Sequence, residues 1–166
     1  MSHTLVVMRH AKSSWKTNDA DLNRPLSGRG TRDAVVAGQR LAGTRFDLVL
    51  ISPAARTRQT WDCLTMAGVS AGEVRIEDDL YHAWTPQVID VLAGVPAQTQ
   101  KVLLIGHEPT VSDLVLTLAS DTTMPDALRI NQKFPTSGIA VLSLEGEWEA
   151  LAADGAELAA FEVPRG

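Results

Sequence analysis

The sequence has one cysteine, Cys63, and no apolar run approaching the roughly 18 residues of a membrane-spanning helix. With a single cysteine the chain cannot form an internal disulfide, and without a long apolar run it has no transmembrane helix. The N-terminal stretch MSHTLVVMRH has neither a basic segment nor a long apolar one, so we expect no signal peptide and a cytoplasmic protein. Basic residues are outnumbered by acidic ones, 15 against 20, and the net charge of −5 argues against nucleic acid as a partner.

Thiol chemistry also has little support in the sequence. Cys63 is expected to be a small buried side chain on a helix. A cysteine-dependent phosphatase needs an arginine a few residues after the thiol to close a phosphate loop, and the stretch CLTMAGV contains none. A catalytic thiolate is therefore the less favoured alternative.

The apolar residues that are present indicate the fold. At 166 residues, 45% of them hydrophobic, the chain fits one domain, residues 1–166, with a sizeable core. Four short Val/Leu/Ile-rich runs are continuous rather than alternating, as in strands buried on both faces; they cover 4–8, 47–51, 101–105 and 139–144. Helical patterns lie between these runs. We predict an α/β fold with a mostly parallel central sheet flanked by helices on both faces.

The helical patterns cover residues 27–43, 52–68, 86–95 and 109–120. Ser27 is expected to cap the first helix, while Ser52 is expected to cap the second and Pro53 to begin it. Residues 138–155 are predicted to form a strand, a turn at Glu145-Gly146 and a second strand.

Basic and imidazole side chains follow three of the predicted strands. Arg9 and His10 follow the first, Arg56 lies in the first turn of the helix after the second, and His107 follows the strand at 101–105. Ligands of open parallel α/β sheets bind at the carboxyl ends of the strands, so we expect these four residues to converge. Arginine matches phosphate oxygens bidentately, and helix starts add N–H donors. The pattern therefore predicts a site for a phosphoryl group.

Each of these residues also has a plainer interpretation. A histidine after a strand is more often a structural hydrogen-bonding residue than a nucleophile, and an arginine in a first helical turn is usually a solvated charge. The occurrence of all four at equivalent strand ends favours the functional interpretation.

The motifs MRHAKS, RPLSGRG, SPAARTRQT and LLIGHEP resemble those of the histidine phosphatase superfamily, and most of all those of its short SixA-type phosphohistidine phosphatases. The resemblance spans about residues 4–144 and implies a phosphoglycerate mutase-like fold. Ala11 stands where the superfamily more often has glycine, a difference that matters only if the backbone there needs a positive φ.

The resemblance implies that His10 is the nucleophile, transiently phosphorylated, with its other ring N–H held by a backbone carbonyl. Arg9, Arg56 and His107 are implied to bind the phosphoryl oxygens, with His107 protonated when phosphate is bound. No metal or other cofactor is expected, because cationic side chains neutralise the phosphate and the sequence has no HExxH motif, no P-loop and no carboxylate cluster at metal-ligand spacing. Arg24, in RPLS, is expected to line the mouth of the site and bind substrate, or to hold the loop before the first helix.

The acid that ester-cleaving members use typically falls two residues after a leucine that follows the third strand. Here His82 stands two residues after Leu80, so it is the candidate acid, although an exposed loop histidine is the plainer interpretation. Glu108 is a second candidate. An alkoxide leaving group needs acid assistance, which contributes about 10²–10⁴-fold, whereas the imidazole of a phosphoramidate leaves more readily. The sequence thus favours a phosphohistidine phosphatase with an open site, acting on a phosphorylated protein.

Two alternatives stay open at this point. One is a phosphatase for small phosphomonoesters, and the other is a non-catalytic phosphate-binding module on the same fold. Neither a nucleic acid nor a membrane is expected as a partner.

Overall fold

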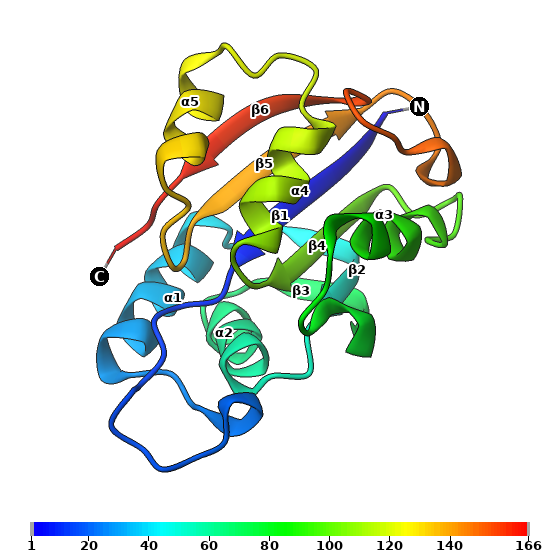
Figure 1. Ribbon diagram of the computed structural model, residues 1–166. Helices are drawn as coiled ribbons and strands as arrows, with labels where there is room; N and C mark the ends of the chain where they lie inside the picture. Colours follow the sequence, from blue (N-terminus) through cyan, green and yellow to red (C-terminus); the bar gives the residue numbers. More distant parts are fainter. Residues whose placement is uncertain (1, 166) are drawn as a thin grey trace.

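The computed structural model describes residues 2–165 and contains a six-stranded sheet with the order β3-β2-β4-β1-β5-β6 (Figure 1). The strands are β1 (His3–Arg9), β2 (Arg45–Ile51), β3 (Ser70–Ile76), β4 (Lys101–Gly106), β5 (Ile139–Leu144) and β6 (Ala156–Glu162). The first four run parallel to one another, whereas β5 is antiparallel to both β1 and β6. The prediction of a mostly parallel sheet is confirmed.

Helices cover both faces of this sheet (Figure 1). They are α1 (Gly28–Arg40), α2 (Ala55–Met66), α3 (Thr85–Ala93), α4 (Thr110–Leu118) and α5 (Pro125–Gln132). Successive side chains of a strand point to opposite faces. Accordingly, Leu5 and Val7 of β1 share a buried cluster with residues of α3, α4 and α5, while Val6 and Met8 share one with residues of α1 and α2. Burial on both faces explains why these strands are continuously apolar.

The start of α2 differs from the prediction. The helix begins at Ala55 with Ala54 as its N-cap residue, so Ser52 is not the cap and Pro53 is not the first helical residue. The Ser52 hydroxyl instead lies 2.7 Å from Nε2 of His107, on the neighbouring strand end. A contact between residues 55 positions apart outweighs the local capping preference. By contrast, Ser27 caps α1 as predicted, accepting a hydrogen bond from the backbone N–H of Gly30 at 3.0 Å.

The C-terminal part also differs from the prediction. The connection after β5 is not a tight turn at Glu145-Gly146, since a short 3-10 helix, Trp148–Ala150, follows, and the second strand is β6 at 156–162. Trp148 is fully buried, which draws this segment onto the core instead of into the sheet. The strand β3 and the helix α5 lie outside the predicted elements. β3 is an edge strand with mostly exposed side chains, so it lacks the apolar run of a central strand.

No helix within residues 2–165 is long and apolar enough to cross a membrane.

Candidate active site

The register of β1 and β4 places two histidines together. Arg9 and Gly106, the last residues of these parallel strands, are paired, so His10 and His107 leave the sheet side by side with ring centroids 5.3 Å apart. β2 lies on the other side of β4 and leads into α2, whose second residue is Arg56. The structure thus brings together the four residues that the strand ends singled out.

These residues surround a pocket of about 250 Å³ at the carboxyl ends of the strands. The segment between β1 and α1 extends from the body of the fold (Figure 1). Several of its residues line one side of the pocket. The lining residues are Arg9, His10, Lys12, Ser13, Trp15, Arg24, Arg56, His107, Glu108 and Thr136. Arg24 therefore joins the four.

His10 is held in one orientation and one tautomer. Its Nδ1 lies 2.6 Å from the carbonyl oxygen of Ala11, which only accepts, so Nδ1–H is the donor and Nε2 carries a free lone pair. Burial lowers the pKa of His10 to about 3, and the nearby charges of His107, Arg56 and Arg9 act in the same direction. The imidazole is thus neutral at physiological pH. Ala11 does not have a positive φ, so it causes no backbone strain where glycine is more usual.

Both arginines that the strand ends singled out are anchored, Arg9 through one terminal nitrogen and Arg56 through two. Nη1 of Arg9 donates to the carbonyl of Phe134 at 3.0 Å, and Nη1 of Arg56 donates to the carbonyl of Asp21 at 2.8 Å. Nη2 of Arg56 also pairs with the Asp21 carboxylate at 3.2 Å. The Nε atoms of both arginines are buried and have no hydrogen-bond partner.

His107 likewise has one nitrogen atom that is held by a contact and one that has no hydrogen-bond partner. The Ser52 hydroxyl contacts Nε2, while Nδ1 is buried without a partner. Burial lowers the pKa of His107 to about 4, and the charge of Arg56 adds to this effect. A hydroxyl can donate to a neutral imidazole or accept from a protonated one, so Ser52 holds the ring in either charge state.

Arg24 both holds the loop before α1 and lines the pocket. It donates to the hydroxyl of Ser13 and, at 3.2 Å, to the carboxylate of Asp21, which holds the loop before α1. It also lines the pocket, with its Nε buried and unpartnered. The indole of Trp15 lies over its guanidinium, 3.7 Å from ring centroid to Cζ.

Four nitrogen atoms of residues that line the pocket are buried and have no hydrogen-bond partner: Nε of Arg9, Arg24 and Arg56, and Nδ1 of His107. A buried donor without an acceptor is costly, and native structures rarely leave one unpaired. The guanidinium and imidazole groups that line this single cavity are complementary to a ligand with several acceptor oxygens. A tetrahedral oxyanion such as phosphate provides that set.

Comparison with known proteins agrees with this geometry. The sequence model of the family described as "Histidine phosphatase superfamily (branch 1)" matches residues 5–82. A structure assigned to phosphohistidine phosphatase SixA of Nakamurella multipartitia is 34% identical, with a TM-score of 0.87 over 99% of this chain and 97% of that one. The chain belongs to the histidine phosphatase superfamily. An uncharacterised protein of Mycobacterium leprae is 42% identical over 165 residues, covering 95% of this chain and all of the relative. The protein histidine phosphatase SixA, in complex with tungstate, shares the fold with a TM-score of 0.80 at 24% identity, over 97% of each chain.

The two candidate acids of this superfamily member are placed differently. His82 is exposed, has a φ of 56° and does not line the pocket; its ring lies 4.0 Å from that of Tyr81. Glu108 does line the pocket, but both carboxylate oxygens accept hydrogen bonds from Ser112, at 2.7 and 2.9 Å. Its carboxylate is thus engaged at the start of α4.

Asp21 is a further residue of this site, and no motif of the sequence indicated it. Its carboxylate joins Arg24, Arg56 and Tyr81, whose hydroxyl donates to it at 2.6 Å. The hydrogen bond from Tyr81 and those from the two arginines hold the pKa of Asp21 below its ordinary value. The three-residue spacing to Arg24 is a weak signal for one of these contacts. The contact with Arg56, 35 residues away, has no local signal in the sequence.

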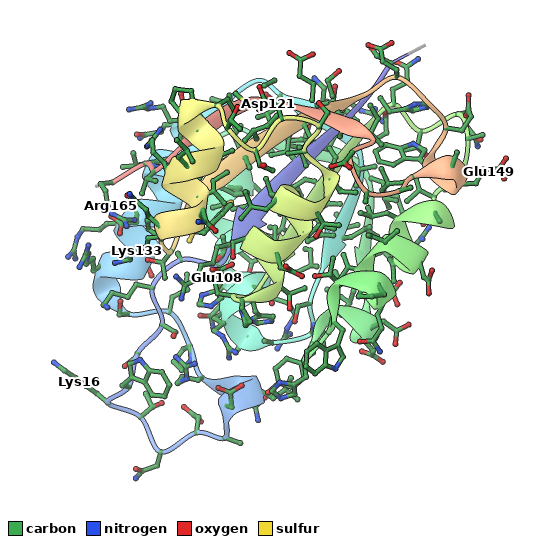
Figure 2. The ribbon with its side chains drawn as sticks, turned by 45° about the horizontal axis from the view of Figure 1, so that its top comes forward. Lys16, Glu108, Asp121, Lys133, Glu149 and Arg165 are labelled. Carbon is green, nitrogen blue, oxygen red and sulfur yellow. The ribbon has the colours of Figure 1, made fainter. Side chains whose placement is uncertain are left out.

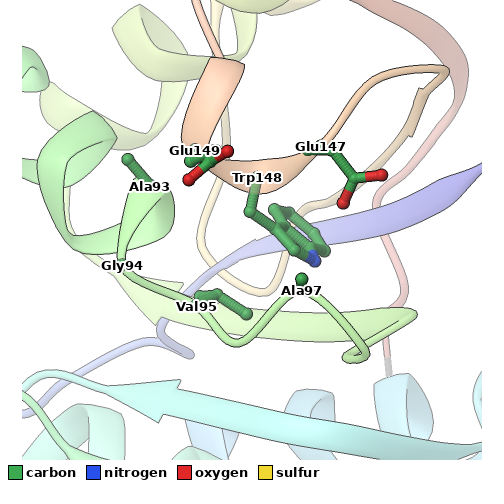
Figure 3. Close-up of a pocket in the computed structure, with 7 residues that line it drawn as sticks. All are labelled: Ala93, Gly94, Val95, Ala97, Glu147, Trp148 and Glu149. Atoms are coloured by element: carbon green, nitrogen blue, oxygen red, sulfur yellow. The ribbon is translucent and has the colours of Figure 1, made fainter.

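A second cavity, of about 260 Å³, lies at the other end of the sheet, between α3 and the Trp148–Ala150 turn (Figure 3). Its wall is built around Trp148, whose indole N–H donates to the carbonyl of Thr99 at 2.7 Å. The charged residues that line it are Glu147 and Glu149, so this cavity repels anions. The phosphate-complementary donors belong to the pocket of His10.

Proposed function

We propose that this member of the histidine phosphatase superfamily is a phosphohistidine phosphatase in which His10 is the nucleophile and a protein carries the substrate phosphohistidine. The observation that carries the proposal is the pocket at the strand ends, where Arg9, Arg24, Arg56 and His107 surround a histidine whose Nε2 is free. Donors fixed in advance around an oxyanion stabilise charge in a transition state without the cost of reorganisation.

In the first step, the lone pair on Nε2 of His10 attacks phosphorus, and the bond between phosphorus and the imidazole nitrogen of the substrate breaks. The departing imidazole, protonated at its other nitrogen, leaves as a neutral ring. The phosphorylated His10 ring is then cationic, and its Nδ1–H remains bonded to the Ala11 carbonyl. Splitting one displacement into two in this way lowers each barrier.

In the second step, water attacks phosphorus, the N–P bond breaks, and its electron pair returns to Nε2 of His10. The proton lost by the water passes to the departing phosphate or to solvent. Throughout, Arg9, Arg24 and Arg56 bind the phosphoryl oxygens. His107 becomes protonated when the dianion enters, because the added negative charge offsets the burial that lowers its pKa in the empty site.

The choice of a P–N bond over a P–O bond rests on the two candidate acids. His82 lies outside the pocket lining, and both oxygens of Glu108 are engaged by Ser112. An alkyl phosphomonoester releases an alkoxide and relies on a proton donor, whereas imidazole is a good leaving group. The structure with tungstate, a tetrahedral oxyanion, concerns a protein histidine phosphatase of the same fold.

A substrate panel tests the proposal: a histidine-phosphorylated carrier protein, free phosphohistidine, p-nitrophenyl phosphate and glycerol phosphate. We expect the two phosphohistidines to have the highest kcat/KM and glycerol phosphate the lowest. His10→Ala should abolish turnover, and His82→Ala is the matched control that should retain it. Faster turnover of glycerol phosphate than of phosphohistidine would identify a small-ester phosphatase, and no turnover of any substrate would identify a binding module.

A further inference from the structure

Trp15 is a large aromatic residue left exposed at the mouth of the candidate active site. It lines the pocket of His10, yet 78% of its surface is accessible to solvent. Large aromatic side chains are usually buried, and an exposed tryptophan at a functional site is typical of residues that dominate protein–protein interfaces. The position of Trp15 therefore requires an explanation beyond the packing of this chain.

The indole is held in place rather than left mobile on a loop. One face lies over the guanidinium of Arg24, which is itself fixed by Ser13 and Asp21. The loop is closed at its base by a hydrogen bond from the N–H of Ser14 to the carbonyl of Pro25, at 2.8 Å. An aromatic side chain that is already ordered loses little conformational entropy when a partner binds.

The charges beside Trp15 indicate the chemistry of the partner. Lys12 is exposed on the pocket wall, and Lys16 projects from the same loop, away from Glu108 and the body of the sheet (Figure 2). Two lysines and an indole form a basic and aromatic rim outside the phosphate-binding donors. Such a rim is complementary to an acidic protein surface with apolar side chains beside its phosphohistidine.

We propose that Trp15, with Lys12 and Lys16, is the docking surface for the protein that carries the phosphohistidine, and that it selects protein-borne over free phosphohistidine. This inference rests on the proposed function, because it takes the phosphohistidine to enter the pocket of His10. The phosphoryl group and its imidazole occupy the pocket, and the surrounding protein surface covers the exposed indole. Free phosphohistidine has no such surface.

Two substrates with the same P–N bond test the proposal: an acidic histidine-containing carrier protein phosphorylated with phosphoramidate, and free phosphohistidine. For Trp15→Ala we expect kcat/KM to fall about tenfold or more with the carrier protein, as for interface hot spots, and to stay within about twofold with free phosphohistidine. Trp15→Phe should recover much of the loss. Lys16→Glu should also lower kcat/KM for the carrier and weaken its dependence on salt. Met66→Ala, at a side chain equally exposed at the far end of α2, is the control and should change neither.

Equal losses on both substrates would overturn the proposal, because Trp15 would then act through Arg24 inside the pocket. No loss on either substrate would overturn it as well. A parallel calorimetric titration of the phosphorylated carrier into His10→Ala, with and without Trp15→Ala, does not depend on turnover. If Trp15→Ala weakens binding of the carrier but the wild-type protein does not turn the carrier over, the docking surface is supported and the proposed function is refuted. A dimer that dissociates on Trp15→Ala would refute the docking surface and assign Trp15 to a contact between copies.

Discussion

At the scale of single residues, the pocket combines the neutral imidazoles of two histidines with the guanidinium groups of three arginines. Burial lowers the pKa values of His10 and His107, so both imidazoles are neutral, while three guanidinium groups line the same pocket. An arriving oxyanion pairs with the guanidinium groups and stabilises positive charge on His107. The same arrangement leaves Nε2 of His10, the proposed nucleophile, unprotonated before a substrate arrives.

The lowered pKa values predict how the protein responds to pH. In the folded protein His10 and His107 titrate at about 3 and about 4, below the ordinary 6.5 that they regain on unfolding. Between these limits the unfolded chain binds more protons, so their contribution to stability is complete above pH 6.5 and is lost progressively as the pH falls toward 4 and then 3. Imidazole NMR signals of both residues should remain those of the neutral ring down to about pH 5. Added phosphate should raise the pKa of His107, and a titration of His107 near its ordinary value without phosphate would contradict this account.

Asp21 is expected to act as a positioning residue for the arginines. Asp21→Asn removes the carboxylate that joins Arg24, Arg56 and Tyr81, so the guanidinium groups lose part of their fixed geometry, although the backbone carbonyl of Asp21 still binds Arg56. We expect kcat/KM for free phosphohistidine to fall about tenfold to a hundredfold, a typical cost of misplacing catalytic groups.

The circular dichroism of Asp21→Asn should stay native, and Asp21→Glu should restore part of the rate. Asp79→Asn, which removes an exposed carboxylate from the turn after β3, is the control and should leave kcat/KM unchanged. Wild-type kinetics for Asp21→Asn would show that Asp21 does not position the arginines.

At the scale of elements, the parts that the sequence predicts are those with a strong local signal. The buried strands β1, β2, β4 and β5 have continuous apolar runs, and the strand ends mark the pocket because parallel topology aligns them. The edge strand β3 has no such run. The start of α2 is determined by the contact between Ser52 and His107. The course of the C-terminal segment is determined by the burial of Trp148. Contacts between distant residues leave no local trace in a single sequence.

The contact between α1 and the loop after β1 depends on a glycine. A Cβ atom on Gly30 would lie 1.9 Å from the carbonyl oxygen of Lys12, so α1 approaches the loop that carries His10 and Ser13 more closely than any side chain permits. Gly30→Ala must push the two apart, and we expect a loss of about 1–3 kcal/mol in the free energy of unfolding, together with lower activity.

Gly28→Ala is the matched control in the same helix, because its Cβ would lie 3.6 Å from the nearest atom, Nη1 of Arg32. Alanine favours the helix over glycine, so this variant should be at least as stable as the wild type. Urea unfolding of both variants measures the difference. Equal stability of the two would show that the close approach of α1 is not needed.

At the scale of the whole molecule, the distribution of charge sets the site apart. The chain carries a net charge of −5, but its His10 pocket is lined by four arginine or lysine side chains and one glutamate: Arg9, Lys12, Arg24, Arg56 and Glu108. An acidic surface with one basic concavity attracts anions to that concavity and away from the rest of the protein. The cavity beside Trp148, with its two glutamates, has the opposite character.

The central claim is that Nε2 of His10 takes the phosphoryl group, and trapping the phosphorylated protein tests it most directly. The wild type is mixed with the histidine-phosphorylated carrier protein, quenched within milliseconds in alkali, in which phosphohistidine survives, and digested for mass spectrometry. The account predicts one phosphoryl group on the peptide that contains His10, absent from His10→Ala and retained in His82→Ala. A phosphoryl group on another residue, or undiminished turnover by His10→Ala, would contradict it.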